Sequence, residues 1–168
     1  LVIRKIYDMI PSNMENKKKR VIVKNIEHTA SHKQFSDYSD EFDYLVNSGV
    51  ALSVQAISNP KFPLKESESK NLIKLYLSDV GILTDLLYRT NINAVLGDER
   101  SVNLGSVYES VVAQELHAHG FTLHYYDNNQ RGEVDFLIDD YDNLTVLPIE
   151  VKSGKDYKVH SALDAFLD

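Results

Sequence analysis

The chain has 168 residues, is 43% hydrophobic and 26% charged, and contains no cysteine. This composition is typical of a soluble globular protein with one domain or two small ones, and it excludes disulfides, thiolate zinc sites and cysteine nucleophiles. The formal net charge of −7 argues against strong autonomous binding to nucleic acid, because such binders usually carry a basic surface. No apolar run is long enough to span a membrane, and we expect a cytoplasmic protein.

Residues 1–90 are predicted to form a helical segment that ends in a pair of strands. Apolar residues at helical spacing predict a first helix, which we expect Pro11 to end. A second helix is predicted over residues 36–48, and an alternating pattern from Val50 to Ile57 predicts a half-buried strand. This order of elements is typical of a winged helix-turn-helix. Three helices and a hairpin also make a plain structural connector.

The second predicted helix exposes acids where a base-reading helix needs Arg, Lys, Asn or Gln. Because acids repel phosphates, we favour a protein-facing or spacing role for this half of the chain. The basic run NKKKR, over residues 16–20, is the patch available for phosphate contact. A solvated loop is the alternative interpretation of this run.

Residues 91–168 are predicted to contain a helix followed by strands. Gly105 and Gly120 bound the predicted helix. On a helical wheel, Glu109 lies at the edge of its apolar face and Glu115 lies within that face. A buried carboxylate is costly unless it is paired or bound to a cation. One of these two glutamates is therefore expected to have a partner.

The stretches GEVDFLI and VLPIEVKSG are predicted to be neighbouring strands of an antiparallel hairpin. Strand alternation then places Asp135, Glu150 and Lys152 on a common face. Converging carboxylates make an oxygen site for Mg²⁺ or Mn²⁺, and a nearby lysine can position a water or stabilise developing charge. A simple ion pair between Glu150 and Lys152 is the structural alternative. Glu133 is either a fourth ligand or, as we expect, a solvated edge residue.

These motifs resemble the core of the PD-(D/E)xK nuclease superfamily, with Glu109 as the extra acid on the preceding helix. The run from about Leu75 to Gly154 is also similar to the C-terminal region of a large group of prokaryotic AAA-type ATPases. That second resemblance rests on KLYLSDVGIL, GSVYESVVAQEL, YYDNNQRGEVDFLI and IEVKSG. It implies an α/β (α+β) fold, with a winged-helix-like segment over residues 1–90 and a nuclease-like core with a short mixed sheet over residues 91–168.

The sequence departs from this pattern in three places. No G-x-x-x-x-G-K-[ST] motif is present, so we expect no ATP hydrolysis by this chain. Val134 replaces the proline that usually precedes the motif Asp135. The chain also ends within a predicted helix near residues 159–168, so the last strand of a nuclease core is expected to be missing. We therefore expect a fragment of a longer protein.

The resemblance implies cleavage of DNA that depends on Mg²⁺ or Mn²⁺. Asp135, Glu150 and Glu109 are the implied metal ligands, and Lys152 completes the catalytic set. A catalytically inactive module that binds nucleic acid or a partner is the alternative, and a structural oligomerisation domain is the third class. The partners to consider are DNA, the ATPase domain that this chain lacks and a second copy of the chain, with no membrane.

Overall fold

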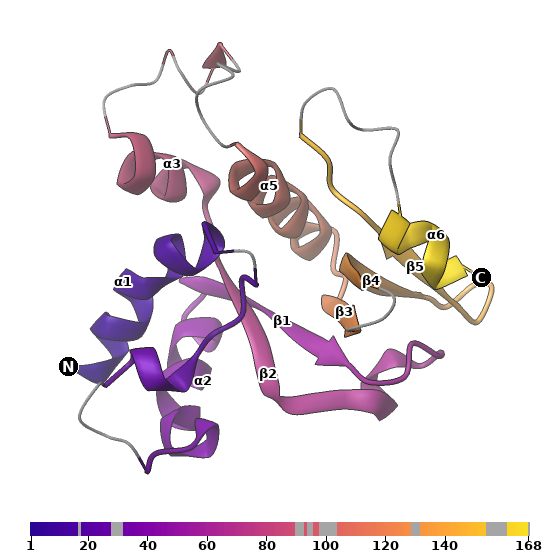
Figure 1. The fold of residues 1–168 in the computed structure, drawn as a ribbon, viewed down its shortest axis with the longest axis horizontal. Coiled ribbons are helices and arrows are strands. Elements are labelled where there is room, and N and C mark those ends of the chain that lie inside the picture. Colours follow the sequence, from indigo (N-terminus) through magenta and orange to yellow (C-terminus); the bar gives the residue numbers. More distant parts are fainter. Residues whose placement is uncertain are drawn as a thin grey trace.

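The computed structural model describes residues 1–16, 18–27, 32–89, 93, 96–97, 104–128, 132–153 and 161–167 (Figure 1). Within these residues a five-stranded mixed sheet is packed against helices, and the predicted α/β class is confirmed. The strands are β1 (Ala51–Ile57), β2 (Glu68–Leu77), β3 (His124–Asn128), β4 (Gly132–Asp140) and β5 (Thr145–Ile149). The helices are α1 (Val2–Met14), α2 (Ser39–Asn47), α3 (Val80–Tyr88), α5 (Gly105–Ala118) and α6 (Ser161–Leu167). Short 3-10 turns lie at Val23–Asn25, Phe35–Tyr38 and Leu64–Ser67.

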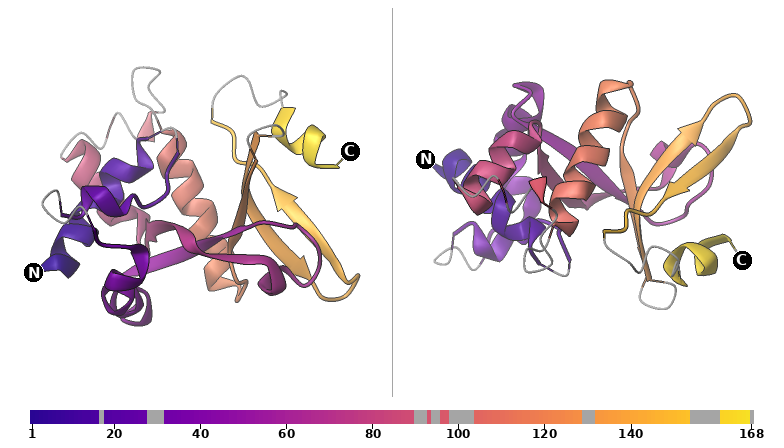
Figure 2. Two further views of the ribbon diagram at one scale, coloured as in Figure 1. Left: turned by 60° about the horizontal axis from the view of Figure 1, so that its bottom comes forward. Right: turned by 90° about the horizontal axis from the view of Figure 1, so that it is seen from above.

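The strand order in the sheet is β2-β1-β3-β4-β5. The β1–β3 pair is parallel, and the other pairs are antiparallel. Because β1 and β2 precede residue 90 and the other strands follow it, one sheet crosses the expected domain boundary. Figure 2 shows the β4–β5 hairpin extending away from the group formed by α1, α2 and α3. The division into two domains stays a prediction.

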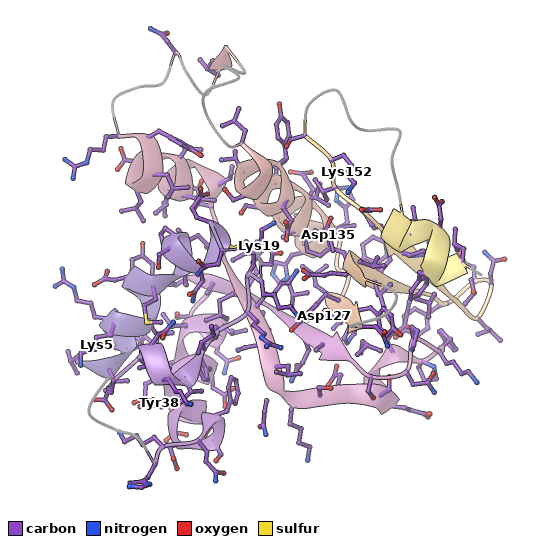
Figure 3. All side chains as sticks on the ribbon, viewed as in Figure 1. Lys5, Lys19, Tyr38, Asp127, Asp135 and Lys152 are labelled. Carbon is purple, nitrogen blue, oxygen red and sulfur yellow. The ribbon has the colours of Figure 1, made fainter. Side chains whose placement is uncertain are left out.

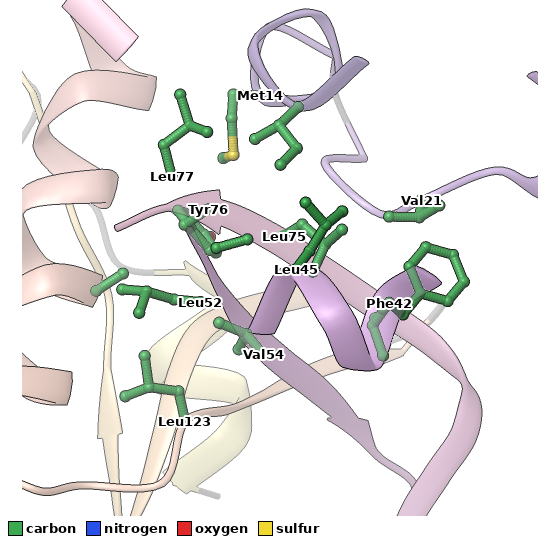
Figure 4. Packing of buried hydrophobic residues seen from close by; sticks show 14 of the residues in the cluster. Met14, Val21, Phe42, Leu45, Leu52, Val54, Leu75, Tyr76, Leu77 and Leu123 are labelled. Atoms are coloured by element: carbon green, nitrogen blue, oxygen red, sulfur yellow. The ribbon is translucent and has the colours of Figure 1, made fainter. Parts of the chain in front are cut away.

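Strand β2 has a different environment on each face, because successive side chains of a strand point to opposite sides. Leu75 and Leu77 pack toward α2 and α1, where Figure 4 shows them beside Leu45 and Met14. Between them on the other face, Tyr76 points toward α5 and bonds to Glu109. The apolar core therefore lies mainly on the α1–α2 side, and polar side chains gather on the α5 side.

One local prediction about the first half was wrong, and one was confirmed. Helix α1 continues through Pro11 to Met14. The proline removes one backbone hydrogen bond, but Ile10, Pro11 and Met14 are all buried, and this burial offsets the loss. The prediction of a half-buried strand is confirmed for β1, because Leu52, Val54 and Ala56 are buried on one face while Ser53 and Gln55 in the middle of the other face are partly exposed.

The predicted helices around residues 36–48 and 105–120 are confirmed as α2 and α5. Each is followed by a glycine with positive φ, 74° at Gly49 and 85° at Gly120. Glycine adopts this conformation without a Cβ clash, which explains why both helices end where they do. No described helix is both long enough and apolar enough to cross a membrane.

Candidate functional site

Asp135 lies on β4 and is half-buried. Its Oδ2 accepts a hydrogen bond from the backbone N–H of Val151, with a nitrogen–oxygen distance of 2.8 Å. Burial, followed by the negative charge of Glu109, raises the pKa of Asp135 to about 6. Both effects disfavour the ionised carboxylate. Figure 3 shows Asp135 and Lys19 in the middle of the molecule, near the sheet and α5.

Glu150 and Lys152 lie just after the end of β5, which closes at Ile149. We expected the strand to continue through Lys152, and that boundary was wrong. Phe136 is paired with Ile149 in the ladder, and beyond this pair the side chain of Asp135 accepts the Val151 N–H. The carboxylate of Asp135 thus accepts the Val151 N–H in place of a backbone carbonyl of the neighbouring strand.

The ladder register of the hairpin ends one residue before the two predicted acids, at the pair of Phe136 and Ile149. If it continues by one residue beyond Phe136 and Ile149, Glu150 stands opposite Asp135. Residues directly opposite in an antiparallel pair project to the same face. The side chain of Glu150 is 6% exposed, and the Lys152 ammonium lies 2.5 Å from its Oε1. The ion pair foreseen as the structural alternative is therefore present.

Glu109 lies on α5 and is buried, whereas Glu115 on the same helix is exposed. Both carboxylate oxygens of Glu109 have partners. Oε2 accepts a hydrogen bond from the ammonium of Lys19, and Oε1 accepts one from the hydroxyl of Tyr76. Burial and the charge of Glu109 raise the pKa of Tyr76 well above its ordinary value. The glutamate predicted to need a partner is thus Glu109, and its partners come from the first half of the chain.

Lys74 on β2 extends this group. Its side chain is 1% exposed, its ammonium is 3.7 Å from Glu109 Oε1, and it forms a closer ion pair with Glu133. The ammonium also lies 4.6 Å from the centroid of the Tyr125 ring, a separation at which a cation is attracted to an aromatic face. Glu133 is therefore not a freely solvated edge residue, because it forms an ion pair with Lys74. Its pairing neutralises a buried lysine.

The sequence analysis missed Lys74 and Tyr76 and gave Lys19 a different role. One signal for Lys74 was available, because a lysine inside the apolar run NLIKLYL needs a buried acidic partner. No local signal pointed to Tyr76, since tyrosine is common in strands. In the basic run, Lys18 pairs with Asp127 on β3 and Lys19 pairs with Glu109. Both lysines contact acids of the second half of the chain.

The donor set for a metal is smaller than the one expected. Among the described residues, no group of three or more His, Cys, Asp or Glu side chains could hold a metal ion. Mg²⁺ is nevertheless often bound through one or two carboxylates, with waters completing its shell. Asp135 and Glu150 fit this smaller requirement, and a cation near Asp135 would relieve the unfavourable charge that raises its pKa. Glu109 is engaged by Lys19.

A cavity of about 530 Å³ lies elsewhere, between the end of α2, the start of β1 and the end of α5. Its lining includes Ser53, Gln114 and Phe121, and none of the four predicted site residues contributes to it. This cavity therefore lies apart from Asp135, Glu150 and Lys152.

Comparison with protein families gives two matches. Residues 1–93 match the family described as Domain of unknown function (DUF8612), and residues 104–167 match the one described as Domain of unknown function (DUF4143). The first match covers more than half of the chain, which therefore belongs to the DUF8612 family. No curated protein and no solved structure matches the chain.

Proposed function

We propose that the second half of this chain carries a metal-dependent centre for cleavage of phosphodiester bonds, with DNA as the substrate. The observation that carries the proposal is the end of the β4–β5 hairpin. There Glu150 follows Ile149, the residue paired with Phe136, so a continued register would set it opposite Asp135, and Lys152 forms an ion pair with Glu150. The raised pKa of Asp135 adds support, because strongly perturbed acids cluster at functional sites.

In this proposal Asp135 and Glu150 hold Mg²⁺ or Mn²⁺. When bound there, such an ion would polarise a phosphate oxygen and lower the pKa of a bound water. The ammonium of Lys152 stabilises the negative charge that develops on the phosphate, an electrostatic contribution that a neutral side chain does not make. The backbone N–H of Val151 holds the Asp135 carboxylate in a single orientation through Oδ2.

We further propose that the chain is the C-terminal part of an AAA-type ATPase protein, with the ATPase domain preceding it. The DUF4143 match over residues 104–167 and the motifs GSVYESVVAQEL and GEVDFLI support this placement. DNA would then reach the centre with the help of the motor, since the net charge of −7 gives this chain little attraction for phosphate on its own. A cytoplasmic location and self-association belong to the same proposal.

A second candidate function is a catalytically inactive module that binds nucleic acid or a partner protein. The observation that favours it is the saturation of Glu109, whose two oxygens already bond to Lys19 and Tyr76. Protein groups already compensate the charge of such an acid, so it can stabilise the fold without a bound metal ion. A fold can retain such a centre after its chemistry is lost.

Titration with Mn²⁺ followed by calorimetry tests the first proposal. The wild-type chain should bind Mn²⁺, and Asp135→Ala should lose this binding because a charged ligand is removed. Asp142→Ala is the matched control, since Asp142 is exposed in the turn of the same hairpin. Lys152→Ala should still bind Mn²⁺, while cleavage falls by about 10²-fold, as when one electrostatic stabiliser is lost.

Cleavage is measured on a longer chain that includes the flanking segments. Single-stranded, duplex and branched DNA, and RNA, are the substrates to compare. Binding of Mn²⁺ without cleavage of any of them would favour the inactive module. Absence of Mn²⁺ binding by the wild-type chain would refute the metal centre itself.

A further inference from the structure

The buried carboxylate of Glu109 is surrounded by cationic and hydrogen-bonding groups that belong to two different segments. Tyr76 and Lys74 approach its Oε1 from β2, and Lys19 bonds to its Oε2 from the chain that follows α1. A carboxylate in such surroundings is satisfied as long as every one of these groups stays in place. Glu109 can bind another cation only if one of these groups moves away, so the most easily displaced group is the one that matters.

Lys19 is the partner able to leave. The side chains of Lys74 and Glu109 are 1% and 3% exposed, whereas that of Lys19 is 21% exposed. Lys74 and Tyr76 are fixed within β2, where both are paired with residues of β1. Lys19 lies outside any helix or named strand, one residue before the isolated bridge that joins Arg20 to Lys74. A rotation of its long side chain would take the ammonium into water without disturbing the sheet.

Glu109 is also close enough to Asp135 for its charge to act on that carboxylate. A divalent cation bound at Asp135 would be attracted to Glu109 and repelled by the ammonium that bonds to it, because both interactions scale directly with charge and inversely with distance. Lys19 and a metal therefore compete for the same carboxylate.

We infer that Lys19 is an internal counter-cation that limits the affinity of the centre for divalent metals, and that it leaves Glu109 when Glu109 becomes a metal ligand. This inference rests on the proposed metal centre. It assigns to one residue of the basic run a role other than phosphate contact. It also makes the segment after α1 part of the centre, because the position of this segment determines whether two or three carboxylates are available.

Mn²⁺ alone is the probe, and calorimetry on the 168-residue chain is the measurement. Lys19→Met removes the charge while keeping most of the side-chain volume, and it should bind Mn²⁺ about tenfold more tightly, the order expected when a unit charge close to a partly exposed site is removed. Lys18→Met is the matched control, since Lys18 is adjacent, pairs with Asp127 and has no contact with Glu109. The Lys18→Met variant should bind Mn²⁺ with the same affinity as the wild type.

A double-mutant cycle with Glu109→Gln shows whether the gain passes through Glu109. In the Glu109→Gln background, Lys19→Met should no longer raise the affinity. Thermal melting without metal verifies that each variant is folded. Lys19→Gln, which keeps a hydrogen-bond donor for Glu109, replaces Lys19→Met if that variant does not fold.

The outcomes separate this inference from the proposal on which it rests. Equal Mn²⁺ affinity of the wild type and Lys19→Met overturns the inference and leaves the metal centre standing. An equal increase in Mn²⁺ affinity for Lys18→Met and Lys19→Met also overturns it. The increase would then come from removing any positive charge in this segment, and not from releasing Glu109. Absence of Mn²⁺ binding in every variant overturns the metal centre and the inference together.

Discussion

Asp135 is the residue at which stability and the proposed chemistry oppose each other. Its pKa in the folded chain is about 6, above the ordinary value of 3.8. The folded state therefore favours the protonated acid. The stabilisation from this preference is fully present below the ordinary pKa, and it is lost as the pH rises through the folded pKa. At neutral pH the ionised carboxylate thus destabilises the fold until a cation compensates its charge.

Replacement of Asp135 by asparagine should reveal this cost. The amide oxygen can still accept the Val151 N–H, so Asp135→Asn should unfold at higher urea concentration than the wild type at about pH 8, with a gain of roughly 1–3 kcal/mol. At about pH 4 the two proteins should have the same stability, because the wild-type acid is then protonated when folded. The measurement is urea unfolding with a chelator present.

Asp142→Asn provides the control, since Asp142 is exposed in the same hairpin and its replacement should leave the stability nearly unchanged at both pH values. A loss of stability in Asp135→Asn that is equal at both pH values would show that the raised pKa is not the reason for the change.

At this scale the sequence supplied the acids but not their partners. Strand alternation predicted a common face for Asp135, Glu150 and Lys152, of which the structure pairs Glu150 with Lys152. Helical periodicity marked Glu109 and Glu115 as candidates for a carboxylate in need of a partner. The partners themselves come from far along the chain, 90 residues away for Lys19 and 33 residues away for Tyr76. Such contacts depend on the tertiary arrangement, and local periodicity carries no information about it.

The β4–β5 hairpin carries the residues of the proposed centre, and its turn contains a strained residue. The side chain of Asp140 accepts hydrogen bonds from the backbone N–H groups of Asp142 and Asn143. Leu144 then adopts a φ of 53°, a left-handed conformation that is unfavourable for a residue with a branched side chain. Leu144 is largely exposed, so no buried contact of its own compensates this strain.

Leu144→Gly should therefore stabilise the protein, with a melting temperature higher by a few degrees, because roughly 1 kcal/mol of backbone strain is removed. Leu147→Gly is the matched control. It makes the same substitution on β5 of the same hairpin, where φ is ordinary, and there glycine should lower the melting temperature. Thermal unfolding followed by circular dichroism measures both. A lower melting temperature for Leu144→Gly would mean that the turn is not strained.

The types of the helices and strands named here were predictable from local sequence patterns, whereas the ends of α1 and β5 were not. The helices around residues 36–48 and 105–120 and the hairpin of β4 and β5 were predicted from periodicity and turn residues. The end of β5 was predicted too late, because the Asp135 side chain captures the Val151 N–H. The end of α1 was predicted too early, because burial of Ile10 and Met14 outweighs the hydrogen bond lost at Pro11. Both errors come from tertiary contacts that override a local rule.

At the scale of the whole molecule, the parallel pairing of β1 with β3 joins the two family segments into one sheet. The ion pairs of Lys19 and Lys74 with Glu109 join them again on the α5 side of that sheet. The strand order was not predictable from the sequence, since pairings between distant strands leave no local pattern. Without the first segment, β3 would have an unpaired edge and Glu109 would be a buried carboxylate without its cations.

Residues 104–168 alone should therefore fail to fold cooperatively. We expect poor dispersion in the amide NMR spectrum and no sigmoidal urea transition, in contrast to the 168-residue chain, because an exposed edge strand and an uncompensated buried charge both oppose folding. Addition of residues 1–93 in trans is the control. A well-dispersed spectrum for the isolated fragment would establish the domain boundary near residue 90 and contradict the single folding unit.

The ion pair between Lys19 and Glu109 restricts which segments of related proteins can be recombined. The two positions lie in segments that match separate families, so recombination can exchange one segment without the other. A donor segment with a neutral residue at position 109 would leave Lys19 without its counter-charge and Lys74 with Glu133 alone, and a reversed charge there would set three cations against one another. Exchange of segments between relatives should therefore succeed only when these positions are inherited together.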